Sequence, residues 1–387
     1  MNNDSLVKDF MNIFKEDEGI YTFFAPGRVN LIGEHTDYNG GHVFPCALNF
    51  GTYALVRKRE DSKFRMVSKN FGNLGIIEAD INSLTYSEED DWANYPKGII
   101  KTFKDAGYLI DKGLEVLFFG NIPNGAGLSS SASIELVMSI AIRSLFSLNI
   151  DMIEMVKLSQ KSENEFNGVN CGIMDQFACG MGRKDHAILL DTNTLDYEYA
   201  PIKSDEISII IANTNKRRSL ADSKYNERRS QCENALKALQ KKLKITCLGD
   251  LSEEEFEKNK YLIQNEIERK RAKHAVYENQ RTIKAVKALK EGNIELFGKF
   301  MNESHISLRD DYEVTGIELD TLVEAAWESG AIGSRMTGAG FGGCTVSLVR
   351  NSEIEKFIKK VGEKYEKEIG HKGDFYVASI GDGARQV

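Results

Sequence analysis

The sequence predicts a mixed α+β fold built as two domains, with mixed sheets packed against helices. Short β-rich runs alternate along the chain with segments whose apolar residues recur at helical spacing. With 387 residues, the chain also exceeds the size at which a single hydrophobic core usually stops growing. Two domains that share a cleft suit a reaction between two substrates.

The predicted elements follow one another in mixed order. An amphipathic helix is expected over residues 1–14, and further helices over residues 134–145 and 219–243. The predicted strands are rich in β-branched and aromatic residues and cover residues 52–57, 115–119, 187–190, 207–211, 345–349 and 375–380. A polar segment at residues 191–205 carries Pro201 and separates two apolar strands near the midpoint of the chain. We therefore expect one domain over residues 1–195 and a second over residues 196–387.

Composition excludes several classes of protein. Apolar residues make up 41% and charged residues 28% of the chain, which is typical of a globular protein. The net charge of -8 argues against a nucleic-acid partner, so the basic residues at 216–218, Arg228 and Arg229 are interpreted as a solvated helix face. No apolar run approaches the roughly 20 residues needed to cross a bilayer. No export leader is evident at the N-terminus, and we expect no membrane partner.

Six cysteines are scattered along the chain without a CxxC pair. This spacing favours reduced thiols over disulfides or a zinc site. The expected location is the cytoplasm, and the expected assembly state is a monomer.

Polar residues set closely among glycines mark a first candidate site at residues 25–48. Arg28, Glu34, His35 and Asp37 fall within ten positions of one another. Sugar hydroxyls both donate and accept hydrogen bonds, and carboxylates and an arginine can satisfy them at fixed angles. A polar turn between two strands is the alternative for this segment taken alone.

A second glycine-rich segment, GNIPNGAGLSSSASI at residues 120–134, lies between a predicted strand and a predicted helix. Gly125 and Gly127 allow backbone N–H groups to converge, and the helix start adds its positive dipole end. The hydroxyls at Ser129–Ser131 can contact a phosphate oxygen or Mg²⁺. The segment predicts either a phosphate-binding turn or an ordinary serine-capped helix. It is neither a GxxxxGK[ST] loop nor part of an HRD and DFG protein-kinase set.

Two more segments carry candidate residues. Gly338, Gly340 and Gly343 formally match GxGxxG, but a strand follows them where a dinucleotide fold requires a helix. We interpret this loop as one that lets the backbone approach a ligand closely before it enters a sheet. Asp175 lies in a small, apolar neighbourhood within residues 168–182, where a carboxylate needs a partner or a chemical task. A helix-capping or salt-bridged aspartate is the alternative.

Together, the four segments resemble the GHMP small-molecule kinases and, within them, the galactokinase family. GRVNLIGEHTDYNGG is similar to the galactokinase signature, GAGLSSSAS to the phosphate loop, CGIMDQF to the catalytic loop and MTGAGFGGC to the C-terminal glycine loop. All four occur in family order. The resemblance implies a two-domain GHMP kinase fold with the active site in the cleft between the domains. Residues 1–195 would carry the signature and the phosphate loop, and residues 196–387 the glycine loop.

The resemblance also implies a role for each matching position. Arg28 and Asp175 match the catalytic pair. The positions that match sugar-binding residues are Arg28, Glu34, His35, Asp37, Gly172, Asp175 and Tyr225. The positions that match nucleotide-binding residues are Trp92, Tyr95, Gly125, Ala126, Gly127, Leu128, Ser129, Ser130 and Ser131. Ser131 and Glu163 match positions that hold Mg²⁺ in related kinases.

The implied reaction is ATP-dependent phosphorylation of the anomeric hydroxyl of galactose to galactose 1-phosphate, with Mg²⁺ as cofactor. Asp175 would accept the hydroxyl proton, and Arg28 would stabilise charge on the transferred phosphoryl group. One alternative is a non-catalytic regulator that binds galactose and ATP, but such regulators lack the Ser-Ala pair that is present here as Ser131 and Ala132. The other is a sister kinase for N-acetylgalactosamine or another sugar.

Overall fold

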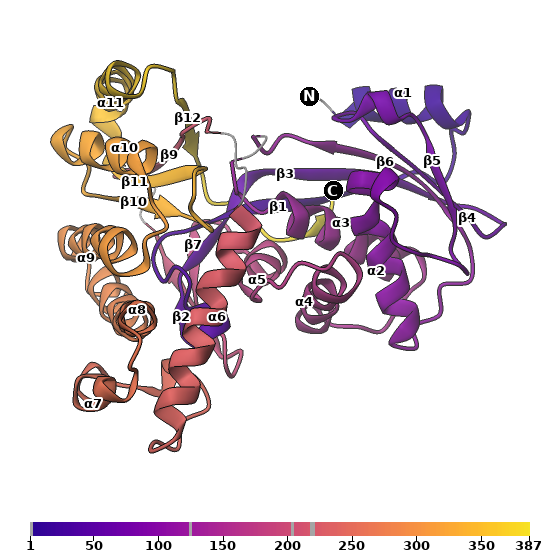
Figure 1. Cartoon of the computed structure of the whole chain (residues 1–387). Helices are drawn as coiled ribbons and strands as arrows, with labels where there is room; N and C mark the ends of the chain where they lie inside the picture. The colour runs from indigo at the N-terminus through magenta and orange to yellow at the C-terminus, as the bar shows by residue number, and fades with distance from the viewer. Residues whose placement is uncertain (1–2, 124–125, 203–204, 217–220) are drawn as a thin grey trace.

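The computed structural model describes residues 3–123, 126–202, 205–216 and 221–387 of the chain (Figure 1). Its strands form a six-stranded, a four-stranded and a three-stranded sheet, with helices packed on their faces. The α+β class expected from the sequence is confirmed. Each of the six predicted strands lies in an observed strand, although the last ends at Ala378 rather than at residue 380.

The six-stranded sheet has the order β13-β1-β3-β6-β4-β5. Its strands are β1 (Tyr21–Asn30), β3 (Pro45–Lys58), β4 (Lys63–Ser68), β5 (Ile77–Asp80), β6 (Leu114–Gly120) and β13 (Arg385–Gln386). All neighbours are antiparallel except the parallel pair β4 and β6. The edge strand β13, from the C-terminal end of the chain, therefore pairs with β1, from its N-terminal end.

Helices cover both faces of this sheet. One face packs against α2 (Asn94–Asp105), α3 (Ser130–Leu145), α4 (Met152–Lys161) and α5 (Met174–Met181). Side chains alternate between the faces of a strand, so Leu55, Val67 and Leu117 point the other way, where they pack against α1 (Asn3–Phe14). A buried hydroxyl joins helix and sheet, because Ser133 on α3 donates to the carbonyl of Ala25 and accepts from the N–H of Thr52.

The four-stranded sheet is antiparallel in the order β10-β11-β9-β12. Its strands are β9 (Ile207–Asn213), β10 (Gly333–Thr337), β11 (Cys344–Arg350) and β12 (Asp374–Ala378). One face packs on α10 (Ile317–Glu328) and α11 (Ile354–Ile369), and the other on α8 (Glu266–Lys290) and α9 (Ile294–Ser307). Outside these, α6 (Ala221–Gln240) and α7 (Glu253–Asn259) pack against α8 in a separate cluster.

Short helical turns connect these elements. They are η1 (Asp37–Asn39), η2 (Gly72–Leu74), η3 (Glu88–Ala93), η4 (Ser162–Phe166), η5 (Leu248–Asp250), η6 (Lys260–Leu262), η7 (Leu308–Tyr312) and η8 (Asn351–Glu353). Two of them, η1 and η4, contribute residues to the site described below.

A third sheet and one shared apolar core join the two halves of the chain. The sheet has the order β2-β7-β8, with β2 (His42–Val43), β7 (His186–Asp191) and β8 (Tyr197–Pro201). The boundary predicted between residues 195 and 196 falls in the connection of the β7–β8 hairpin. Residues after β1 and in β3, such as Leu31 and Cys46, pack in the same cluster as Ile209 and Val346 of the four-stranded sheet. The division into two domains stays a prediction.

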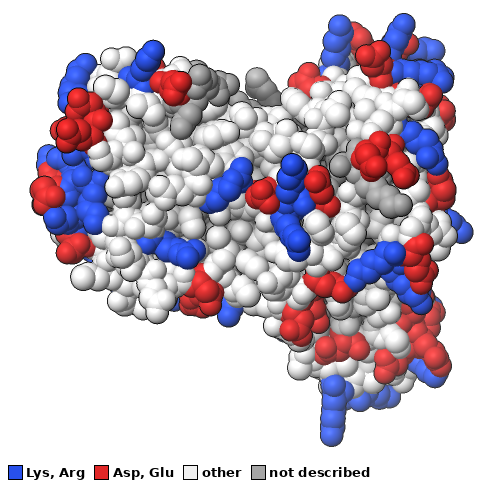
Figure 2. All heavy atoms as spheres, turned by 180° about the vertical axis from the view of Figure 1, so that it is seen from behind, with Lys and Arg blue, Asp and Glu red and all other residues white. Residues whose placement is uncertain are grey.

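All six cysteines are free. No helix in the described part of the chain is both long enough and apolar enough to span a membrane. On the face shown in Figure 2, basic and acidic residues are interspersed rather than separated into fields of one sign.

Candidate active site

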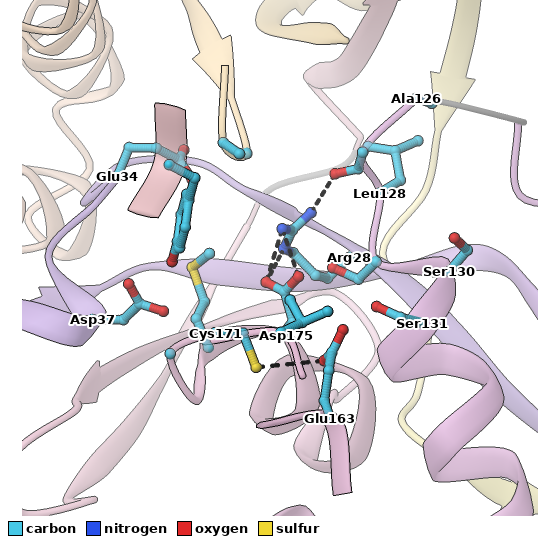
Figure 3. Close-up of a pocket in the computed structure, with 18 of the residues that line it drawn as sticks. Arg28, Glu34, Asp37, Ala126, Leu128, Ser130, Ser131, Glu163, Cys171 and Asp175 are labelled. Atoms are coloured by element: carbon cyan, nitrogen blue, oxygen red, sulfur yellow. Dashed lines mark hydrogen bonds and ion pairs between the residues drawn. The ribbon is translucent and has the colours of Figure 1, made fainter. Parts of the chain in front are cut away.

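A cavity of about 330 Å³ gathers the residues that the sequence singled out (Figure 3). Its lining comes from β1 and η1, the loop before α3, η4, the start of α5, α6 and the glycine loop after β10. The lining residues are Arg28, Glu34, His35, Asp37, Ile122, Pro123, Ala126, Gly127, Leu128, Ser129, Ser130, Ser131, Glu163, Val169, Cys171, Gly172, Met174, Asp175, Tyr225, Gly338 and Ala339. The four segments that the sequence singled out therefore line one cavity, together with Glu163 and Tyr225.

Arg28 and Asp175 form the centre of the cavity. The Nε and Nη2 atoms of Arg28 lie 2.8 and 2.9 Å from the two carboxylate oxygens of Asp175, in the bidentate geometry that suits a guanidinium. The Arg28 side chain is 5% exposed, whereas the Asp175 side chain is 28% exposed and opens into the cavity. Burial lowers the pKa of Arg28, but the carboxylates of Asp175 and Glu34 outweigh it, so the net shift is upward and Arg28 stays charged.

Local backbone structure brings the phosphate-loop segment onto this pair. The register of β1 and β3 shifts between Pro26 and Arg28, which turns Arg28 toward the loop before α3. Nη1 of Arg28 donates to the carbonyl of Gly127 at 2.8 Å, and its backbone N–H donates to the carbonyl of Leu128. A Cβ at Gly27 would lie 2.6 Å from the Leu128 carbonyl oxygen, so glycine permits this approach.

The turn before α3 is not an ordinary serine cap. Gly127 and Ser129 both have positive φ values, of 70° and 61°, and Ser129 at the cap position makes no side-chain capping bond. Its buried hydroxyl has no hydrogen-bond partner within the described ranges. The first N–H groups of α3 therefore lack a cap from the Ser129 side chain, an arrangement that suits an anion. Gly125, expected to belong to this turn, lies outside the described residues.

A second cavity, of about 230 Å³, adjoins the first and shares Ile122, Ser130 and Ser131 with it. Trp92 and Tyr95, the two expected aromatic residues, line this second cavity. The sequence did not indicate its other wall, which is formed by Thr52, Ser68, Asn70, Phe71, Asp91, Phe118, Gly120 and Ile134. The buried indole Nε1 of Trp92 lacks a hydrogen-bond partner in the described structure.

Buried acidic groups surround Ser131. In Figure 3, Ser131 and Glu163 point toward one another beside Asp175. Burial, and then the neighbouring Asp175 carboxylate, raise the pKa of Glu163, while hydrogen bonding from Ser131 opposes that shift. Gln176 donates to Glu163 and also, at 3.1 Å, to Glu135, a fully buried residue that sequence reasoning missed. Burial raises the pKa of Glu135 well above its usual value.

The sugar-signature residues line the opposite side of the cavity. Glu34 is held by Arg335 on β10, with 2.8 Å between Nη2 and Oε2. Burial, and then the neighbouring Asp175 carboxylate, raise the pKa of Asp37 to about 7. A Cβ at Gly172 would lie only 1.8 Å from Oδ2 of Asp37, so the turn before α5 can approach η1 only with glycine there.

His35 and Tyr225 complete that side. Burial, and then His274, lower the pKa of His35 to about 3, so its ring is neutral near pH 7. Tyr225 on α6 lies beside His35, with ring centroids 5.7 Å apart. Its hydroxyl keeps its proton because burial and then Asp37 raise its pKa well above the usual value.

The cavity offers oxygen ligands but no dense metal cluster. Among the described residues, no group of three or more His, Cys, Asp or Glu side chains could hold a metal ion. Ser131 and Glu163 supply two oxygens, which suits Mg²⁺, an ion that usually takes few protein ligands and completes its shell with water and phosphate oxygens. The two residues fit the ion on the chemistry of their donors.

Comparison with known proteins places this fold and site in a family. The chain matches the models "GHMP kinases N terminal domain" over residues 94–183 and "GHMP kinases C terminal" over residues 285–367. A crystal structure of mevalonate kinase is 19% identical, with a TM-score of 0.63, and covers 93% of this chain and 98% of its own, a likeness of fold alone. The fold and the site define a GHMP kinase.

The match is closer within that class. Residues 8–58 match the model "Galactokinase galactose-binding signature". Galactokinases from Fusobacterium nucleatum and Bacillus subtilis are 64% and 58% identical, over 99% and 98% of this chain and 99% and 97% of their own. The crystal structure of Lactococcus lactis galactokinase complexed with galactose is 50% identical, with a TM-score of 0.98 and full coverage of both chains. The chain belongs to the galactokinase family.

Proposed function

We propose that the protein transfers the γ-phosphoryl group of ATP to the anomeric hydroxyl of galactose, giving galactose 1-phosphate and ADP. The observation that carries the proposal is the junction of the two cavities at Ser130 and Ser131. A nucleotide in the second cavity, with its base beside Trp92 and Tyr95, would place its terminal phosphate at this junction. The Arg28–Asp175 pair faces the same junction from the sugar side.

Asp175 and Arg28 have different tasks in this proposal. The exposed edge of the Asp175 carboxylate accepts the proton of the attacking hydroxyl and orients that hydroxyl toward the phosphorus. Arg28 uses one N–H from each of its three nitrogens on Asp175 and Gly127. A guanidinium has five N–H donors, so two remain for oxygens of the transferred group. Arg28 thus fixes the base and the phosphate loop while it lowers the cost of developing charge.

The other expected residues take binding roles. Glu34, His35, Asp37, Gly172 and Tyr225 bind the sugar, and Trp92 and Tyr95 hold the adenine. The turn at residues 125–131 and the N-terminal end of α3 bind the ATP phosphates through backbone N–H groups. Ser131 and Glu163 hold Mg²⁺, which when bound neutralises phosphate charge. Because the carboxyl groups of Glu163 and Asp175 lie close enough to repel one another, the cation would also offset that repulsion.

We further propose that this site lies in a cleft between two domains, residues 1–195 and 196–387, and that the protein acts as a cytoplasmic monomer. The lining residues from Arg28 to Asp175 precede residue 196, whereas Tyr225, Gly338 and Ala339 follow it. Free thiols throughout the chain are in keeping with a reducing compartment.

The decisive experiment measures ADP release against a panel of sugars and identifies the product. Galactose should support turnover and yield galactose 1-phosphate, and Asp175→Asn should bind both substrates but lose turnover by roughly 10²- to 10⁴-fold. Galactose binding without ADP release would favour the regulator, and faster turnover of N-acetylgalactosamine would favour the sister kinase. Near-normal turnover in Asp175→Asn would remove this residue from the chemistry.

A further inference from the structure

A chain of side-chain hydrogen bonds runs from the sugar side of the cavity into the protein core. Nδ1 of His35 lies 2.8 Å from the hydroxyl of Tyr38, which lies 2.8 Å from the hydroxyl of Tyr312. The Tyr312 hydroxyl is 3.2 Å from the Sγ of Cys232. Of these four residues, His35 alone lines the cavity in the described structure.

At the cavity end of this series of hydrogen bonds, one ring nitrogen of His35 is left without a partner among the described residues. His35 is 4% exposed, and its Nε2 has no hydrogen-bond partner among the residues that the structure describes. The backbone of Ala339 favours the protonated ring but does not complete a hydrogen bond to Nε2. A buried polar atom without a partner is costly, so this nitrogen marks the position of a polar group on a ligand.

The hydrogen bonds of Nδ1 also determine whether Nε2 of His35 donates or accepts a hydrogen bond. A neutral imidazole has one N–H donor and one acceptor, so the role of Nδ1 decides the role of Nε2. Each tyrosine hydroxyl carries one proton and can donate to one neighbour only. The bonds from His35 through Tyr38 to Tyr312 therefore share one direction, either toward the ring or away from it, and that direction sets the tautomer of His35.

The Tyr312 end of this series of hydrogen bonds is held rigidly. Tyr312 is fully buried at the end of η7, and the next residue, Glu313, has a φ of 55°. Arg228 donates from Nε to the carbonyl of Tyr312 at 2.8 Å and from Nη2 to the carbonyl of Glu313 at 3.0 Å. The expectation that Arg228 lies on a solvated helix face is wrong, because the residue is 7% exposed and locks this turn.

We propose that Tyr38 and Tyr312 are positioning residues for the sugar: they hold His35 in one tautomer and orientation, so that its Nε2 bonds one hydroxyl of the substrate. The proposal rests on the proposed function, since it requires galactose in the cavity. Neither tyrosine lines the cavity. Their contribution therefore lies in sugar affinity and in discrimination between hydroxyls, not in phosphoryl transfer.

Kinetics of Tyr312→Phe test the proposal. The change removes one hydroxyl and keeps the ring. KM for galactose should rise roughly three- to tenfold, the size expected for one weakened hydrogen bond, while kcat and KM for ATP stay within about twofold. Tyr38→Phe should act likewise, and the double variant should cost little more than either change, because both hydroxyls act through one path.

A series of deoxygalactoses identifies the hydroxyl that His35 bonds. In the wild type, removal of that hydroxyl should weaken binding, whereas in Tyr312→Phe the same removal should cost roughly three- to tenfold less. The other deoxy sugars should lose equal affinity in both proteins. Equal losses for every sugar in the series would overturn the proposal.

Tyr365→Phe is the matched control. Tyr365 on α11 is also fully buried, donates its hydroxyl to the Thr214 carbonyl at 2.8 Å and does not line the cavity. If Tyr365→Phe raises KM for galactose as much as Tyr312→Phe, the effect is general loosening and the proposal is wrong.

Ring ¹⁵N shifts of His35, measured without sugar and assigned with His35→Asn, test the positioning proposal separately from the proposed function. The wild type should show one neutral tautomer, and Tyr38→Phe should show a mixture of the two. Unchanged shifts in Tyr38→Phe would overturn the proposal that the tyrosines set the tautomer of His35. Calorimetry that finds no galactose binding by the wild type would instead overturn the proposed function.

Discussion

Four carboxyl groups line one cavity: Glu34, Asp37, Glu163 and Asp175. Arg335 and Arg28 each form an ion pair with one of these groups, Glu34 and Asp175 respectively. The remaining two, Asp37 and Glu163, both have pKa values raised mainly by burial. At the scale of the residue, the site therefore holds two carboxyl groups whose ionisation is disfavoured until a ligand supplies hydroxyl donors or a cation.

Asp37→Asn should stabilise the unliganded protein at neutral and alkaline pH. The pKa of Asp37 is about 7 in the fold against an ordinary 3.8, so its contribution to stability is greatest below pH 3.8 and is lost as pH rises to about 7. Asparagine does not titrate. The advantage of the variant should grow from pH 5 to 7.5, reach on the order of 2 kcal/mol and then stay constant.

Urea unfolding of the wild type and of Asp37→Asn at a series of pH values measures this difference. Other titrating groups are common to both proteins and cancel. A difference in unfolding free energy that does not change across this range would mean that Asp37 is ionised at its ordinary pKa in the fold.

Arg28→Lys should lower kcat by roughly a hundredfold, although the positive charge is kept. Lysine has no planar fork, so it cannot bond both oxygens of Asp175 and the Gly127 carbonyl at once. Steady-state kinetics check the loss, with Arg350→Lys as a control because Arg350 forms an exposed ion pair with Glu295. A rate within a few-fold of the wild type would show that charge alone suffices.

At the scale of the element, the site depends on how closely two turns approach. The turn before α5 contacts η1 at Gly172, where a Cβ would overlap the Asp37 carboxylate. Gly172→Ala should therefore push these elements apart, with a loss of about 1–3 kcal/mol in stability and a higher KM for galactose.

Thermal unfolding and sugar kinetics of Gly172→Ala provide the test. Gly72→Ala is its control, since a Cβ there would meet nothing within 4 Å and the backbone does not have positive φ. If Gly172→Ala behaves like the control in both measurements, the close approach of the two turns does not require glycine at this position.

Local sequence patterns predicted the elements better than their meeting points. Strands and helices follow from periodicity, which is a local property, and so all six predicted strands were found. The segment at 191–205 was expected to be a polar boundary, but it contains β8, because pairing with β7 outweighs its weak local preference.

Site residues that stand in a local motif could likewise be predicted from the sequence. The residues that hold them in place, which stand in no such motif, could not. Arg28, Glu34 and Asp175 stand in glycine-rich segments whose composition already indicates chemistry. Arg335 reaches Glu34 across 301 positions, and the role of Glu135 depends on a buried amide that only tertiary packing supplies. Phe71 and Asn70 were missed because β4, β6 and η3 must assemble before the second cavity exists.

At the scale of the whole molecule, the two halves of the chain share buried surface. Leu31 and Cys46 pack with Ile209 and Val346, and the β7–β8 hairpin spans the predicted boundary. Full-length protein should therefore unfold in one calorimetric transition, and a fragment ending at residue 195 should not fold alone. Two resolved transitions, or a fragment with a cooperative melt, would show that the halves are independent domains.

The strand β13 covers one outer edge of the six-stranded sheet. Phe23 and Phe24 of β1 pair with Gln386 and Arg385, and the N–H of Val387 bonds the Thr22 carbonyl. An edge strand presents unpaired N–H and C=O groups that can pair with another chain, and β13 covers these groups along Phe23 and Phe24 of β1. Loss of β13 would therefore leave that stretch of β1 bare and open to pairing between molecules.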